Sequence, residues 1–234
     1  MSAAAAAHAG LASELVLTDT VARADEAYRR NGNVLLDDLF GATLHRRPAG
    51  TDAVAAAKDR AAELVVSGRR PYVVGSGGSS PVGCLGYAAC AAEIRAQERD
   101  LALSFGRIIV FNGSSGTHAG LAAGLTALDD AASRVLSFTV LAPLERSIES
   151  TQRLAAETFA LLGPDQAGDE IGIVVSGSAL GEGYGVPTAA MFEAVRLVAR
   201  TEGLLLDPVY GGKAFAGLLA AISSEKLGDA PVLF

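Results

Sequence analysis

The stretch that decides the fold is Arg107-Ile-Ile-Val-Phe-Asn-Gly-Ser-Ser-Gly-Thr-His-Ala-Gly-Leu-Ala-Ala-Gly-Leu125. Its apolar run at 108–111 predicts a buried strand, and a glycine–serine turn follows at 112–116. From Ala119 onward, small residues predict a helix that packs closely against its neighbours. At such a helix start, free backbone N–H groups and the positive end of the helix dipole face the same point, and both favour an anion. We therefore interpret the turn as a phosphate cradle.

The side chains of this turn add to its hydrogen-bonding capacity. Ser114, Ser115 and Thr117 carry hydroxyl donors, and Gly113 and Gly116 let the backbone approach a ligand closely. Glycine–serine turns between a strand and a helix are nonetheless common in α/β proteins, and many of them bind nothing. The turn taken alone leaves a phosphate site and a purely structural turn both open.

Two named phosphate motifs do not match the chain. The only Gly-Lys pair, Gly212-Lys213, is followed by Ala214 and has Asp207 where a Walker loop places its first glycine. The segment 181–185 begins like a dinucleotide fingerprint but lacks its last glycine. These mismatches disfavour a nucleotide-binding α/β protein.

Composition narrows the class of protein. The chain has 234 residues, of which 50% are hydrophobic and 19% charged, and this is typical of a compact α/β enzyme rather than a disordered or fibrous chain. The net charge is −7, and basic residues cluster only in pairs such as Arg29-Arg30. We therefore expect no nucleic acid and no anionic membrane as a partner. No apolar run approaches the ~20 residues of a membrane span.

The two cysteines bear on the compartment. Cys84 and Cys90 lie on one predicted helix, where a spacing of six residues puts their Cα atoms about 9 Å apart. That distance is too long for a disulfide bond. We therefore expect a reducing, cytoplasmic location.

Helical and strand patterns alternate along the chain, which predicts an α/β fold with mainly parallel sheets. The glycine–serine run at 77–80 is the best candidate for a hinge, so we expect a smaller lobe at 1–76 and a larger one at 77–234. Predicted strands lie at 14–18, 42–46, 71–75, 108–111, 134–141, 171–175, 204–206 and 232–234. Predicted helices lie at 3–9, 19–30, 34–39, 53–66, 81–97, from 119, 148–162, 188–202 and 213–227.

Five segments together resemble one family. They are Pro71-Tyr-Val-Val-Gly-Ser-Gly-Gly-Ser-Ser-Pro-Val-Gly83, the loop 113–120, Gly183-Tyr-Gly-Val-Pro187, Arg200-Thr-Glu-Gly-Leu-Leu-Leu-Asp-Pro-Val-Tyr-Gly-Gly-Lys213 and Gly32-Asn-Val-Leu-Leu-Asp37. In this order they resemble the pyridoxal-phosphate enzymes of the D-cysteine desulfhydrase and 1-aminocyclopropane-1-carboxylate deaminase family. The resemblance covers essentially the whole chain. It implies the tryptophan-synthase β-like fold (fold type II), with two α/β lobes that each contain a parallel sheet.

The resemblance assigns the phosphate-binding turn. It implies that Ser114, Ser115, Gly116 and Thr117 bind the phosphate of pyridoxal 5'-phosphate. Ser115 stands where desulfhydrases usually have Gly or Ala, a departure that leaves the backbone donors in place.

The resemblance also assigns two tyrosines. Tyr184 and Tyr210 match residues that line the family's substrate pocket, where a phenol can hold the cofactor ring or a substrate carboxylate and can move protons. The alternative for each is a half-buried tyrosine whose hydroxyl is satisfied structurally.

Gly211 bears on the substrate. Deaminases of the family place Glu directly after the second tyrosine, where a carboxylate keeps the ring nitrogen protonated. Gly211 departs from that pattern, and it also lacks the small hydroxyl side chain of desulfhydrases. We therefore expect β-elimination from a small amino acid such as D-cysteine to give pyruvate and ammonia, with negligible deamination of 1-aminocyclopropane-1-carboxylate.

The family's Schiff-base lysine is not found in its motif. In the family it precedes a Ser-Asn-His segment, and both come before an alanine-rich helix like the one with which this chain starts; a His-Thr-Gly-Gly segment follows a strand like the one at 232–234. We therefore expect a chain truncated at both ends that binds the cofactor weakly and turns over little or nothing. Lys58 and Lys226 are interpreted as surface residues, Lys213 as a family lysine with another role, and His118 as a packing or hydrogen-bonding residue.

The preferred interpretation is thus a pyridoxal-phosphate-dependent lyase of the D-cysteine desulfhydrase type. It implies a small amino-acid substrate, a homodimer and no metal ion. The alternatives are an aminocyclopropane-carboxylate deaminase and a non-catalytic pseudoenzyme that keeps the phosphate site for a regulatory ligand.

Overall fold

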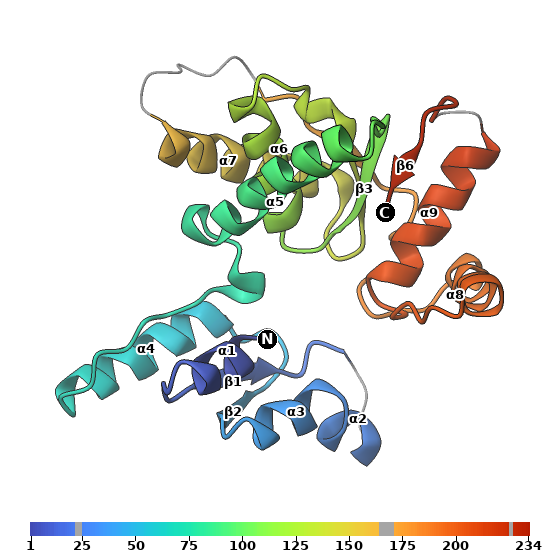
Figure 1. The fold of residues 1–234 in the computed structure, drawn as a ribbon. Helices are drawn as coiled ribbons and strands as arrows, with labels where there is room; N and C mark the ends of the chain where they lie inside the picture. Colours follow the sequence, from blue (N-terminus) through green and yellow to red (C-terminus); the bar gives the residue numbers. More distant parts are fainter. Residues whose placement is uncertain (22–24, 164–170, 225–226) are drawn as a thin grey trace. The chain divides into compact units, whose positions relative to one another are not determined.

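The computed structural model describes residues 1–21, 25–163, 171–224 and 227–234 (Figure 1). It divides into two compact units, Met1–Val74 and Gly75–Phe234, which are described separately. The predicted α/β class with a parallel sheet in each part is confirmed.

The unit Met1–Val74 contains a two-stranded parallel sheet. Strand β1 (Glu14–Thr18) pairs with β2 (Thr43–Arg47), and Glu14 lies opposite Thr43. Its helices are α1 (Ser2–His8), α2 (Glu26–Arg30), α3 (Asn33–Leu39) and α4 (Ala53–Val66).

An ion-pair cluster connects the strands of this unit to α4. Glu14 Oε2 accepts a hydrogen bond from Arg60 Nε at 2.8 Å. The same carboxylate oxygen lies 2.6 Å from His45 Nε2. The hydrogen bonds from Arg60 and His45 hold the pKa of Glu14 at about 2. The carboxylate therefore stays charged and fixes the helix over the sheet.

The unit Gly75–Phe234 contains a four-stranded parallel sheet in the order β5-β4-β3-β6. Strand β3 (Arg107–Asn112) pairs with β4 (Val135–Thr139), with Ile108 opposite Val135, and on its other side with β6 (Val232–Leu233). Strand β5 (Val174–Ser176) forms the far edge beside β4. The order places β3 inside the sheet, so the turn that follows it starts at the carboxyl edge of a buried strand.

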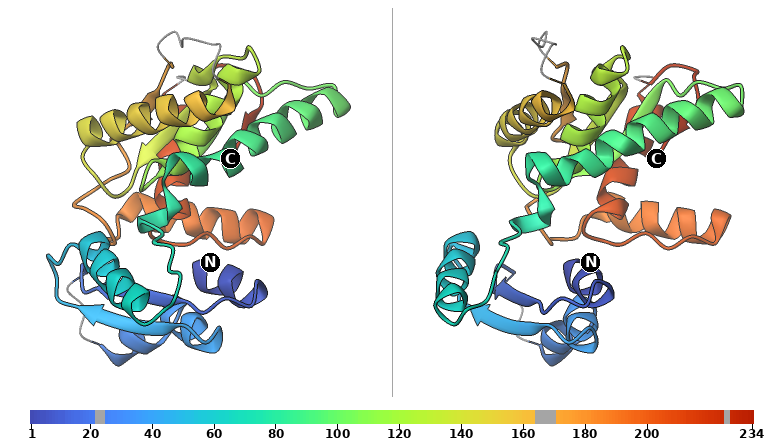
Figure 2. Two further views of the ribbon diagram at one scale, coloured as in Figure 1. Left: turned by 90° about the vertical axis from the view of Figure 1, so that its left-hand side faces the viewer. Right: turned by 60° about the vertical axis from the view of Figure 1, so that its left-hand side comes forward.

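Helices cover both faces of this sheet (Figures 1 and 2). Ile108 packs with residues of α5 (Pro81–Asp100) and α6 (Gly116–Ala127), and α7 (Leu144–Leu162) packs beside α6. The next residue, Ile109, faces the other side and packs with α9 (Gly211–Ser223), beyond which lies α8 (Ala189–Glu202). Successive side chains of a strand point to opposite faces, so the unbroken apolar run at 108–111 is explained by a sheet buried on both sides.

Two predicted strands are wrong. Residues 71–75 and 204–206 form no strand, and Tyr72 and Leu205 are 79% and 87% exposed. Each run has strand-like composition but no neighbouring strand to pair with among the described residues. Part of the predicted helix 19–30 and the end of the helix 213–227 lie outside the described residues.

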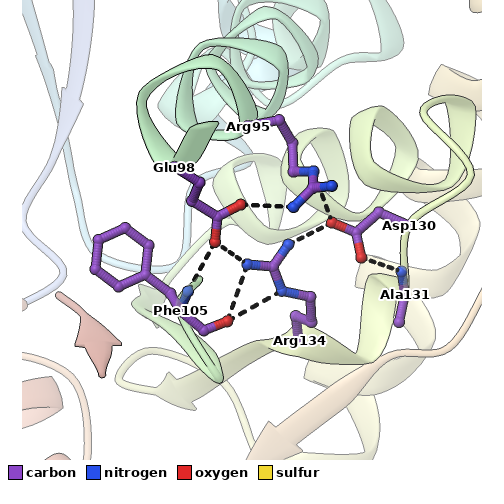
Figure 3. A network of polar contacts seen from close by, with 6 residues as sticks. All are labelled: Arg95, Glu98, Phe105, Asp130, Ala131 and Arg134. Atoms are coloured by element: carbon purple, nitrogen blue, oxygen red, sulfur yellow. Dashed lines mark hydrogen bonds and ion pairs between the residues drawn. The ribbon is translucent and has the colours of Figure 1, made fainter. Parts of the chain in front are cut away.

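A buried network of ion pairs closes the end of α5 (Figure 3). Glu98, only 2% exposed, accepts hydrogen bonds from the backbone N–H of Phe105 and from Arg95 Nη1, both at 2.8 Å, and from Arg134. Arg134 also pairs with Asp130. Burial by itself raises the pKa of Glu98, but these hydrogen bonds outweigh it, so the pKa is lowered and the carboxylate stays charged.

Glu98→Gln is expected to lower the free energy of unfolding by about 2 kcal/mol, because it removes the charge that balances two arginines in a buried site. The measurement is urea denaturation at pH 7, with the exposed Glu93→Gln on the same helix as the matched control. The folded-state pKa is lowered, so the stabilising charge is present above the unfolded pKa of 4.5 and is lost as pH falls through the folded value. The difference between wild type and variant should therefore shrink below pH 4.5, and a difference that is constant down to pH 3 would contradict this role.

The described part of the chain contains neither a candidate membrane-spanning helix nor a candidate metal site. No helix there is long and apolar enough to cross a membrane. No group of three or more His, Cys, Asp or Glu side chains is placed to hold a metal ion.

Candidate functional site

The turn between β3 and α6 presents free backbone donors. Helix α6 begins at Gly116, and the first N–H to bond within the helix is that of Ala119, which donates to Ser115 O at 3.0 Å. The N–H groups of Gly116, Thr117 and His118 therefore have no acceptor one turn earlier, and no side chain among the described residues caps the helix. Together with the helix dipole they form a site that favours an anion.

Ser115 has the one unusual backbone in this turn. Its φ is +69°, in the left-handed region that is costly for a residue with a side chain, by about 1–3 kcal/mol. Its hydroxyl is buried and lies 2.6 Å from Ser150 Oγ and 3.3 Å from Asn112 Oδ1. The hydroxyl therefore faces the interior, and its contacts with Ser150 and Asn112 are structural. The backbone of Ser115 remains part of the turn.

The glycine–serine run at 76–80 packs directly on the turn. Ser79 Oγ lies 2.7 Å from Ser114 Oγ. A Cβ atom on Gly77 would lie 2.2 Å from Ser114 Oγ, and one on Gly116 would lie 2.5 Å from Ser79 Oγ. Gly77, in the short 3-10 helix η1 (Ser76–Gly78), also has a φ of +68°. Two motifs that lie 35 residues apart in the sequence therefore form one structure, and glycine is required where they meet.

The two predicted tyrosines lie together beside this turn. Tyr184 Oη is 2.7 Å from Tyr210 Oη, and their ring centroids are 5.9 Å apart. The ring of Tyr210 covers Gly113, where an added Cβ would lie 3.4 Å from Tyr210 Cε1, and it also packs on Phe111. Burial and the hydrogen bond to Tyr210 raise the pKa of Tyr184, so its phenol stays protonated. The structure thus brings together residues from β3, from the 183–187 segment and from the start of α9.

Asp207 orients Tyr210, and sequence reasoning did not single it out. Its Oδ1 accepts from the N–H groups of Val209 at 2.9 Å and Tyr210 at 2.7 Å, and its Oδ2 accepts from Gly211 N–H at 2.8 Å. These bonds start α9 and fix the residue before it. The available signal was an Asp shortly before a helix start, a position where carboxylates commonly bind free N–H groups.

Lys213 is buried and binds two backbone carbonyl oxygens. Its Nζ donates to Leu180 O and Gly183 O, both at 2.8 Å, and burial lowers its pKa. These bonds attach α9 to the segment that leads into Tyr184, which fits a lysine that does not carry the cofactor. Lys58 is on α4 and Lys226 lies outside the described residues.

His118 lies beneath the turn as a neutral side chain. It is 1% exposed, its Nδ1 is 2.7 Å from Ser137 Oγ, and burial lowers its pKa to about 3. Among the described residues nothing bonds to its Nε2. This matches the prediction of a packing and hydrogen-bonding role.

The donor set fits the phosphate of pyridoxal phosphate. Uncapped N–H groups at the start of α6, the half-buried hydroxyl of Thr117 and the exposed Ser114 surround a backbone that has no Cβ at Gly113 and Gly116. These are neutral hydrogen-bond donors at a helix N-terminus, which is the arrangement that binds phosphate esters. Tyr184 and Tyr210 add two aromatic rings and two phenol hydroxyls beside this turn.

Comparisons with known proteins bear on these residues. The sequence pattern of the family described as "Pyridoxal-phosphate dependent enzyme" matches residues 1–234. The chain is similar to a solved structure described as an ACC deaminase homologue, with 32% identity and a TM-score of 0.80. The match covers 98% of this chain and 66% of that one, just under two thirds of its length.

More distant solved structures share the fold. A threonine deaminase whose source is given as T.th. is 18% identical with a TM-score of 0.61, and the match covers 99% of this chain and 71% of that one. An L-serine ammonia-lyase from the fungus Rhizomucor miehei is 16% identical with a TM-score of 0.57, with coverage of 99% and 72%. The predicted family and fold type are confirmed. With a family pattern that spans every residue, the chain belongs to the pyridoxal-phosphate-dependent enzymes.

Proposed function

We propose that the chain is part of a D-cysteine desulfhydrase-type lyase. The reaction is D-cysteine plus water to pyruvate, ammonia and hydrogen sulfide. The Cα–H and Cβ–S bonds break in the elimination, and water then breaks the Cα–N bond when 2-aminoacrylate is hydrolysed to pyruvate and ammonia. The observation that carries the choice of reaction is Gly211, directly after Tyr210, where the family's deaminases have Glu. A Cβ on Gly211 would lie 3.1 Å from Asp207 Oδ2, so any side chain at this position would be close to that carboxylate at its first atom.

In this proposal the residues of the turn hold the cofactor. Backbone N–H groups of Ser115, Gly116 and Thr117, with the hydroxyls of Ser114 and Thr117, bind the phosphate. Bound pyridoxal phosphate supplies an electron sink that stabilises negative charge at the substrate Cα. The chain's own groups orient the cofactor, exclude water and move protons.

The tyrosine pair has the role of holding a proton near the substrate. Either phenol can donate in the 2.7 Å contact between Tyr184 Oη and Tyr210 Oη, and burial and this bond raise the pKa of Tyr184. In this proposal Tyr184 is the donor and Tyr210 Oη the acceptor. The proton of Tyr210 is then available to the departing sulfur or to the substrate carboxylate. We further propose a small amino-acid substrate, a homodimer and a cytoplasmic location, with no nucleic-acid or membrane partner.

The second candidate is an aminocyclopropane-carboxylate deaminase, and the solved structure described as an ACC deaminase homologue favours it. The two functions differ in product. Any turnover should therefore release pyruvate from D-cysteine, with negligible 2-oxobutanoate from 1-aminocyclopropane-1-carboxylate. Release of 2-oxobutanoate at a rate that rivals pyruvate formation would reverse the assignment.

Titration calorimetry with pyridoxal phosphate tests the cofactor site, and weak saturable binding is expected. The chain holds no lysine in the family's Schiff-base motif, so borohydride reduction after incubation should leave no stoichiometric lysine adduct, and little pyruvate should form. A stoichiometric adduct accompanied by pyruvate would contradict the expected inactivity. Binding without turnover is also the outcome of the pseudoenzyme alternative, whereas saturable binding of a nucleotide but not of pyridoxal phosphate would contradict both.

A further inference from the structure

A second layer of polar side chains lies beneath the phosphate turn. Asn112, the last residue of β3, donates from Nδ2 to Ser137 Oγ at 3.1 Å and to Thr151 Oγ1 at 3.0 Å. Its Oδ1 accepts from Ser115 Oγ at 3.3 Å. The network is buried, and it connects the end of the strand to the turn and to helix α7.

Ser115 is the residue in this layer that needs support. Its left-handed backbone directs the chain from the strand into α6, and so sets where the first N–H groups of the helix point. Glycine adopts this conformation without steric cost, whereas a residue with a Cβ does so only when its surroundings hold it there. The nearest such support is the 2.6 Å contact between Ser115 Oγ and Ser150 Oγ.

Ser150 is itself held in place. Its hydroxyl lies 3.3 Å from Ser147 O one turn earlier in α7, and the neighbouring Thr151 donates to the same carbonyl oxygen at 2.6 Å. Consecutive residues of α7 thus reach the turn and Asn112. Helix α7 contributes nothing to the turn's backbone, yet its Ser150 side chain contacts the Ser115 hydroxyl.

We propose that Ser150 is a positioning residue for phosphate binding: through Ser115 Oγ it holds the left-handed turn that aims the N–H groups of Gly116 and Thr117 at the anion. The proposal rests on the proposed function, because it takes the cofactor phosphate as the anion. The support for this left-handed backbone therefore comes from a residue of another helix.

The test is a double-mutant cycle on the full chain, with titration calorimetry of pyridoxal phosphate as the measurement. Ser150→Ala is expected to raise the Kd about fivefold, the equivalent of one lost hydrogen bond. Ser115→Gly is the reference for the second arm of the cycle, and its own Kd is measured first, because glycine adopts the left-handed conformation without steric cost. In the Ser115→Gly background, Ser150→Ala should have no further effect, because glycine needs no support.

Controls separate positioning from general destabilisation. Thr158→Val removes another buried hydroxyl of α7, one that donates to Leu154 O at 2.7 Å in its own helix, and it should leave the Kd unchanged. Ser150→Thr keeps the hydroxyl and should restore wild-type affinity. Binding of pyridoxal, which has no phosphate, should respond to none of these substitutions.

Two results would overturn the proposal while wild type binds the cofactor: an unchanged Kd in Ser150→Ala, or the same fivefold loss in both backgrounds. A wild-type chain that does not bind pyridoxal phosphate would instead overturn the proposed function, and this inference with it.

Discussion

Gly120→Val is expected to lower the free energy of unfolding of the Gly75–Phe234 unit by about 3 kcal/mol or more, a large share of the stability of a domain. A Cβ on Gly120 would lie 2.4 Å from Cys84 O and 2.6 Å from Tyr87 Cβ. The first of these atoms belongs to the backbone of α5, which cannot turn aside as a flexible side chain would. Helix α6 would have to move away from α5 and would carry the start of the phosphate turn with it.

Urea denaturation followed by circular dichroism measures this effect, and Gly86→Val is the matched control. Gly86 lies on α5, where an added Cβ has nothing within 4 Å, so the same substitution there should change stability by less than about 0.5 kcal/mol. If Gly120→Val and Gly86→Val lower the free energy of unfolding equally, the effect of Gly120→Val comes from helix propensity and not from the close approach of α5 and α6.

Acid is expected to destabilise the protein through His118 before it protonates the carboxylates. Burial lowers the pKa of His118 from 6.5 to about 3 in the folded state, so between these values only the unfolded chain takes up the proton. The unfolded state binds more protons there, so stability is complete above pH 6.5 and falls as the pH decreases toward 3. Between pH 7 and pH 5 the expected loss is about 2 kcal/mol.

Unfolding free energies of wild type and His118→Gln at pH 7 and pH 5 check this expectation. The variant has no group at this position that titrates in the interval, so its stability should change little. The exposed His8→Gln serves as control and should lose stability with acid as wild type does. A wild-type stability that is equal at the two pH values would contradict the neutral, buried state of His118.

The sequence predicted the parts of the fold that depend on local pattern. The alternation of elements and the run at 108–111 were sufficient for the parallel sheet of the larger unit. The helix predicted from Ala119 begins three residues earlier, at Gly116. The runs at 71–75 and 204–206 have the same apolar character but remain outside any sheet. Strand formation requires a partner elsewhere in the chain, and composition does not reveal whether one is present.

The sequence predicted which residues form the candidate site better than it predicted how they are arranged. Motif context singled out Tyr184 and Tyr210, and their hydroxyls meet at 2.7 Å. The Ser115 hydroxyl points inward because of the left-handed backbone and the contact with Ser150, which lies 35 residues further along the sequence. Neither can be inferred from the residues of the turn. Asp207 was missed because its role is to bind backbone N–H groups, for which many aspartates are equally suited.

The contact of the Tyr210 ring with Gly113 has an optical consequence. The chain contains no tryptophan and five tyrosines, so its ultraviolet emission comes mainly from phenol rings. The ring of Tyr210 lies against Gly113 in the turn, and the hydroxyl of Tyr184 is hydrogen-bonded to that of Tyr210. A ligand that binds there changes the surroundings of both tyrosine rings, so tyrosine fluorescence can report ligand binding without an added label.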